Sequence, residues 1–126
     1  MAVDVSREEF ERMVLDVLNT LPEDIARYLE NVDVVIARWP TREELLRAGV
    51  PPGQTLLGLY EGVPLTQRGI YYGLVPPDKI TIFQGPLESI ALNRDDLRAR
   101  IRRTVLHELA HHFGISDERL RELGAY

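Results

Sequence analysis

The chemistry of this chain is concentrated in residues 107–117, which read HELAHHFGISD. All 3 histidines of the chain lie within this segment. Residues four apart on an α-helix stand on the same face, so His107 and His111 can present two imidazole nitrogens to one ion. Glu108 lies one step round the same side, where it can reach a metal-bound water without binding the metal itself.

A catalytic zinc site needs a third protein ligand and an open position for water. Gly114 can end the helix in a left-handed conformation and turn the chain back. Asp117 is then placed to supply a carboxylate oxygen as the third ligand. A second interpretation stays open, because Ser116 and Asp117 are also typical of a helix start, as cap and first-turn acid. His112 points about 100° away from His111, so we expect it to support the structure or the ligands.

The pattern H-E-x-x-H-x-x-G-x-x-D resembles the metal site of the zincin metallopeptidases, in the metzincin-like version whose third ligand is Asp. The chain is also similar to a family of small bacterial zincin-like proteins, in which this motif lies near the C-terminus. The resemblance extends to residues 79–87 and more loosely to residues 57–62. It departs from metzincins in one respect. They carry a methionine beneath the metal, downstream of the third ligand, whereas the methionines here are Met1 and Met13.

The resemblance implies a zinc-dependent metallopeptidase. Zn2+ would be bound by His107, His111 and Asp117, and Glu108 would be the catalytic general base in hydrolysis of a peptide or protein substrate. The chain is small and lacks the large lower subdomain that ordinary zincins carry below the metal site. These two features keep a second function open: a metal-binding module with a regulatory or peptide-binding role and little catalysis. A third is an interaction protein without metal, in which the histidines are ordinary helix residues.

Composition narrows the class of protein. With 126 residues, 44% hydrophobic and 28% charged, the chain predicts one globular domain over residues 1–126. The absence of cysteine excludes disulfides and thiol catalysis. A formal net charge of -5 gives no support to nucleic-acid binding. No apolar run approaches membrane-spanning length and the acidic N-terminus is not a signal peptide, so we expect no membrane association and a cytoplasmic location.

Cap and turn residues predict the elements that position the motif. The predicted helices cover residues 7–21, 22–29, 42–48, 94–113 and 116–123. The predicted strands cover residues 32–38, 56–60, 70–75 and 79–83, with an exposed loop at 61–69. We expect Leu97, Ile101 and Phe113 on the buried side of the motif helix, and Thr104 on the opposite side. This order of elements favours an α+β fold, a minimal zincin-like domain with one small mixed sheet.

The strand before the motif helix suggests where a substrate would bind. In zincins an edge strand runs above the metal and pairs with extended substrate. By resemblance, the stretch from Ile80 to Gln84 is predicted to be this edge strand, binding peptide through main-chain hydrogen bonds. The alternative is an ordinary edge strand, protected from pairing by Pro86 and a polar loop.

Overall fold

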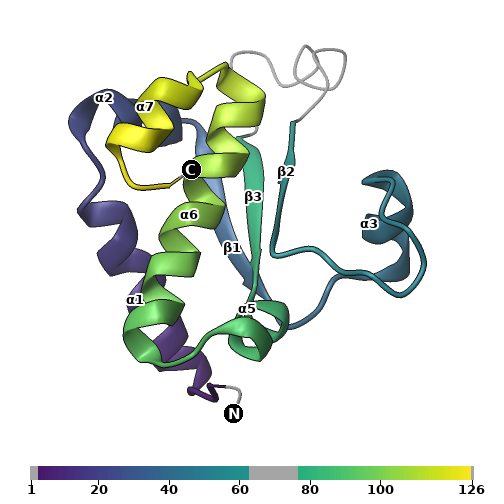
Figure 1. The fold of residues 1–126 in the computed structure, drawn as a ribbon. Helices are drawn as coiled ribbons and strands as arrows, with labels where there is room; N and C mark the ends of the chain where they lie inside the picture. The colour runs from purple at the N-terminus through teal and green to yellow at the C-terminus, as the bar shows by residue number, and fades with distance from the viewer. Residues whose placement is uncertain (1–2, 63–76, 126) are drawn as a thin grey trace.

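A three-stranded sheet with helices on one face forms the centre of the molecule (Figure 1). The computed structural model describes residues 3–62 and 77–125, so the predicted strand at 70–75 and most of the predicted loop at 61–69 lie outside the described residues. The helices are α1 (Arg7–Asn19), α2 (Glu23–Ala26), η1 (Arg27–Leu29), α3 (Arg42–Arg47), α5 (Gln84–Ile90), α6 (Arg94–Phe113) and α7 (Asp117–Glu122). The strands are β1 (Val32–Ala37), β2 (Gly58–Glu61) and β3 (Asp78–Phe83).

The sheet is mixed and its strand order is β1-β3-β2. Strand β3 pairs parallel with β1, with Ile80 opposite Val34, and antiparallel with β2, with Ile80 opposite Tyr60. The expected α+β fold with a small mixed sheet is therefore confirmed. No helix in residues 3–62 and 77–125 is long and apolar enough to cross a membrane.

The prediction that Ile80 to Gln84 forms an edge strand is wrong. Strand β3 is the central strand, with β1 and β2 on either side. Ile80, Ile82 and Phe83 are all 0% exposed and Thr81 is 3% exposed, so both faces of this strand are covered. Gln84 does not belong to the strand at all, because it is the first residue of helix α5.

Helix α6 is the longest element and begins and ends where the sequence indicates. The side chain of Asn93 accepts a hydrogen bond from Asp96 N at 2.8 Å, and Gly114 ends the helix with φ 71°. Two residues differ from expectation. Thr104 is buried at 8% exposure, whereas Phe113 is 37% exposed and stacks on Tyr28 with ring centroids 4.8 Å apart.

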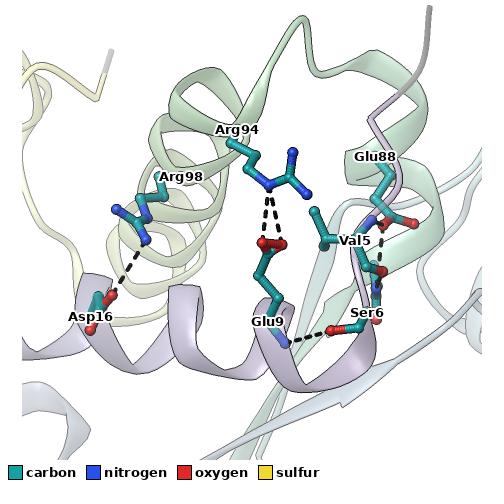
Figure 2. Close-up of polar contacts among 8 residues, drawn as sticks. Val5, Ser6, Glu9, Asp16, Glu88, Arg94 and Arg98 are labelled. Carbon is teal, nitrogen blue, oxygen red and sulfur yellow. Dashed lines mark hydrogen bonds and ion pairs between the residues drawn. The ribbon is translucent and has the colours of Figure 1, made fainter.

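Polar contacts fix the N-terminal segment against the start of α6 (Figure 2). Ser6 caps α1 by accepting from Glu9 N at 3.0 Å, while the Glu9 carboxylate accepts from Arg94 Nε at 3.0 Å. The buried Glu88 carboxylate accepts from Val5 N at 2.8 Å. The apolar face of α1 is then held against α6, and together with β3 these helices form the core.

Helix α6 also lies very close to strand β2. A Cβ atom added to Gly58 would lie 2.6 Å from Thr104 Cγ2 and 3.6 Å from Glu108 Cγ. A Cβ atom added to Gly62 would lie 3.8 Å from the His112 ring. Every fourth residue of α6 thus faces every second residue of the β2 segment. This register is favourable because four helical residues rise about 6 Å and two strand residues about 6.6 Å.

We predict that Gly58→Ala destabilises the fold by about 1–3 kcal/mol, because its methyl group overlaps the Thr104 methyl. Denaturant unfolding measures this change. The double variant Gly58→Ala/Thr104→Ser should regain most of the loss, since serine lacks Cγ2 but keeps the hydroxyl that donates to Arg100 O at 2.8 Å.

Gly62→Ala is the matched control for this measurement. Its nearest contact would be Asp78 Oδ1 at 3.6 Å, an ordinary van der Waals distance, so its effect should be small. Equal losses for both glycine variants, or no recovery in the double variant, would contradict the close packing of α6 on β2.

Candidate functional site

The two histidines of the motif lie next to each other near the C-terminal end of α6. Their ring centroids are 6.3 Å apart and the rings are nearly perpendicular, at 85°. His107 is half-buried and His111 is exposed. The four-residue spacing therefore places both imidazoles on one side of the helix, as the sequence predicts.

Glu108 lies beside them but faces strand β2. Its Oε1 atom accepts a hydrogen bond from the main-chain N–H of Tyr60 at 2.9 Å. Burial raises the pKa of Glu108 above the ordinary value of a glutamate; the Tyr60 hydrogen bond and the charges of His111 and His107 act in the opposite direction. A carboxylate with a raised pKa is a better proton acceptor, which is the property a general base needs.

Tyr60 joins this site from a part of the chain that the motif does not include. Its ring stacks on His112 with centroids 3.9 Å apart and an interplanar angle of 18°. Its hydroxyl donates to Asp78 Oδ2 at 2.6 Å, and His112 Nε2 lies 4.0 Å from the same oxygen. His112 thus packs on the sheet, in line with the supporting role expected of it. The role of Tyr60 was not predicted from the sequence. The signal that could have indicated it is the alternation of glycine and tyrosine in Gly58-Leu59-Tyr60-Glu61-Gly62, because glycine in a strand permits another element to pack closely.

Asp117 is the first residue of α7, directly after the helix cap. Ser116 accepts a hydrogen bond from Arg119 N at 3.1 Å. Arg119 also binds Asp24 of α2, with Nη2–Oδ1 at 3.0 Å and Nε–Oδ2 at 3.2 Å. These contacts place α7 against α2, beside the C-terminal turns of α6 (Figure 1). Within residues 3–62 and 77–125, no group of three or more His, Cys, Asp and Glu side chains lies close enough together to hold a metal ion.

The C-terminal turn contacts His107. The His107 Nε2 atom lies in hydrogen-bonding contact with the main-chain oxygen of Ala125. Ala125 is fully buried, and its N–H donates to Leu120 O at 2.9 Å. Gly124 makes the turn possible with φ 71°. Through this turn, the chain that follows α7 contacts a ring nitrogen of His107, a predicted metal ligand.

The donor atoms on α6 suit a metal ion only in part. Two imidazoles at a four-residue spacing, with a carboxylate beside them, are the donor chemistry of a zinc site. Among the described residues the arrangement is incomplete, because Asp117 is not grouped with the histidines and the Nε2 atom of His107 is engaged by Ala125. Metal binding at that atom requires the Ala125 carbonyl to move away.

A surface hollow adjoins the same residues. It has a volume of about 330 Å³ and lies between α6 and the segment that leads into β2. His107, Glu108 and Thr104 line it from the helix, and Gly58 and Leu57 line it from the other side. The hollow brings solvent, and any ligand within it, to the motif histidine and to the carboxylate.

Comparison with known proteins agrees with the predicted family and fold. Residues 29–125 match the model of the zincin-like metallopeptidase family. This chain therefore belongs to the zincin-like metallopeptidases. A solved structure of a conserved hypothetical protein from Thermus thermophilus is similar, with a TM-score of 0.57 and 25% identity, covering 86% of this chain and 94% of that one. Among curated proteins no significant match was found.

We predict that Gly124→Ala strengthens zinc binding by up to roughly tenfold. A non-glycine residue in the left-handed conformation costs about 1–2 kcal/mol, and this cost weakens the turn that holds Ala125 on His107. Titration with zinc in the presence of a competing chelator measures the change.

Gly49→Ala is the matched control. Gly49 also follows a helix, also has φ 71°, and likewise has no atom within 4 Å of an added Cβ, but it lies after α3. Its zinc affinity should equal that of the wild type. If Gly124→Ala binds zinc no more tightly than Gly49→Ala, the C-terminal turn does not compete with the metal.

Proposed function

We propose that this protein is a zinc-dependent metallopeptidase in which Glu108 acts as the general base. The observation that carries the proposal is the position of Glu108. A half-buried carboxylate with a raised pKa lies beside two histidines of the family motif. When bound, a zinc ion would supply a water of lowered pKa and a positive charge for the oxygen of the scissile carbonyl.

Glu108 would take the proton from the attacking water and later return it to the leaving amine. Its Oε1 atom is held by Tyr60 N–H, which leaves its second oxygen for this task. The carboxylate lines the hollow next to α6, so a substrate carbonyl in that hollow would lie within its reach.

His107, His111 and Asp117 are the ligands that we propose for the metal. Movement of the Ala125 carbonyl away from His107, together with an approach of α7 to the histidines, would complete the set. The cap hydrogen bond of Ser116 and the Arg119–Asp24 ion pair are the contacts that such a shift must change. Exposed ion pairs of this kind contribute little to stability.

For the substrate, we propose that an extended peptide binds along the outer edge of β2. This strand lies at an edge of the described sheet and next to the motif helix. Peptide addition would use the outward main-chain groups of Gly58, and a side chain of the peptide could enter the adjoining hollow, while the N–H of Tyr60 stays bound to Glu108. The cytoplasmic location expected from the sequence stays a prediction.

A second function is favoured by one specific observation. The described residues do not bring three metal donors together, and His107 is engaged by Ala125. A protein that stays in this arrangement would be a zincin-like binding module without turnover. Only the first function predicts peptide hydrolysis, which is lost when Glu108 is replaced.

We therefore predict that Glu108→Gln lowers peptide hydrolysis by roughly 10²–10⁴-fold, because the amide cannot accept a proton from water. Zinc-loaded protein is incubated with a peptide library, and the cleaved bonds are identified by mass spectrometry. Zinc affinity should stay within a few-fold of the wild-type value, since glutamine keeps the shape and the acceptor oxygen.

Glu118→Gln is the control, because Glu118 is exposed in the first turn of α7. It should leave hydrolysis unchanged. Hydrolysis that survives Glu108→Gln would remove Glu108 as the base, and wild-type protein that binds zinc but cleaves no peptide would favour the binding module.

A further inference from the structure

We infer that Tyr60 is a positioning residue for Glu108. The contacts of the Tyr60 side chain, here called the clamp, hold the Tyr60 main-chain N–H against one carboxylate oxygen of Glu108. This hydrogen bond fixes the direction in which the Glu108 carboxylate points. The inference rests on the proposed role of Glu108 as the base. It adds a residue of strand β2 to a site whose other residues come from the motif.

The N–H of Tyr60 points outward from the sheet. In the antiparallel pair of β2 and β3, Phe83 N donates to Leu57 O at 3.0 Å. Alternate residues of an antiparallel strand direct their polar groups to the same side, so Leu59 faces β3, while Gly58 and Tyr60 face away from β3, toward the edge of the sheet as described for residues 3–62 and 77–125. The Glu108 carboxylate reaches this edge and accepts the Tyr60 N–H at 2.9 Å.

The side chain of Tyr60 is held by contacts on two other elements. Its ring stacks on His112 of α6 at 3.9 Å between centroids, and meets Phe113 edge-on at 5.8 Å. Its hydroxyl donates to Asp78, at the start of β3, at 2.6 Å. These contacts fix residue 60 relative to the helix that carries Glu108.

The register of helix and strand explains why this arrangement forms. Gly58 permits the close approach at Thr104, which sets the distance for the next pair, Tyr60 and Glu108. A glutamate side chain has three rotatable bonds, and a hydrogen bond from a fixed main-chain donor restricts them before substrate arrives. Without the clamp on Tyr60, both the donor and the carboxylate would sample other orientations.

Amide hydrogen exchange of zinc-free, nitrogen-15 labelled protein tests the inference. In wild type the Tyr60 amide should be protected although it faces away from β3, as should the amide of Leu59, which faces β3. Glu108→Ala removes the acceptor and should speed exchange at Tyr60 by about tenfold or more, with Leu59 unchanged. Glu108→Gln keeps an acceptor oxygen and should retain part of the protection.

The role of the clamp is tested by Tyr60→Leu, which removes the stacking and the hydroxyl but keeps the main-chain N–H. Exchange at residue 60 should speed up, and the carbon-13 shift of the Glu108 carboxyl should move. Tyr28→Leu is the matched control, since Tyr28 also stacks on α6, at Phe113, but belongs to η1. It should change neither signal. Tyr60→Phe keeps the ring and should restore most of the protection.

An unprotected Tyr60 amide in wild type would overturn the inference, as would equal effects of Tyr60→Leu and Tyr28→Leu. Leu59 reports loss of the strand as a whole, so acceleration of both amides together would also count against a specific clamp. None of these signals requires hydrolysis. Failure of peptide cleavage would therefore refute the proposed function and leave the positioning of Glu108 by Tyr60 standing. Failure of the exchange pattern would refute the positioning and leave the proposed function standing.

Discussion

Helix α6 and strand β2 run side by side with repeats that nearly match, about 6 Å for four helical residues and about 6.6 Å for two strand residues. Three pairs follow from this register: Thr104 with Gly58, Glu108 with Tyr60, and His112 with Gly62. One side of the motif helix, with Thr104, Glu108 and His112, is thereby packed on the sheet. His107 and His111 lie beside this packed side of the helix. The packing that stabilises the fold also orients the carboxylate.

Local signals in the sequence were enough to locate most elements. Asn93 and Gly114 set the ends of α6 as predicted, because capping and a left-handed glycine act within a few residues of chain. The Thr41 capping box likewise starts α3. Ser6 caps α1 as well, but the Glu9 carboxylate binds Arg94, a residue far away in the sequence.

Features that depend on distant contacts were not accessible in this way. The order of strands depends on pairing between distant segments, which the sequence does not show. The edge position that the resemblance implied for residues 80–84 is therefore wrong, and β3 lies at the centre. Thr104 was expected on the side of α6 that faces away from the core. It is buried because Gly58 of β2 packs against it, and the sequence of the helix contains no information about that contact. The motif likewise identifies His107 and Glu108, but not their partners Ala125 and Tyr60, which tertiary packing supplies. The predicted metal ligand Asp117 lies in the structure as the first residue of α7, which fits the cap interpretation and leaves its metal role to experiment.

The most direct test of a zinc site at the end of α6 is a crystal structure of zinc-loaded protein, with the metal located by anomalous scattering. We predict one zinc ion bound by His107, His111 and Asp117 at about 2.0–2.2 Å. The Ala125 carbonyl should be displaced from His107, and Glu108 should remain close by without binding the metal. Zinc absent from the two histidines at saturating concentration, or held by them while Ala125 and α7 keep their present positions, would contradict this site.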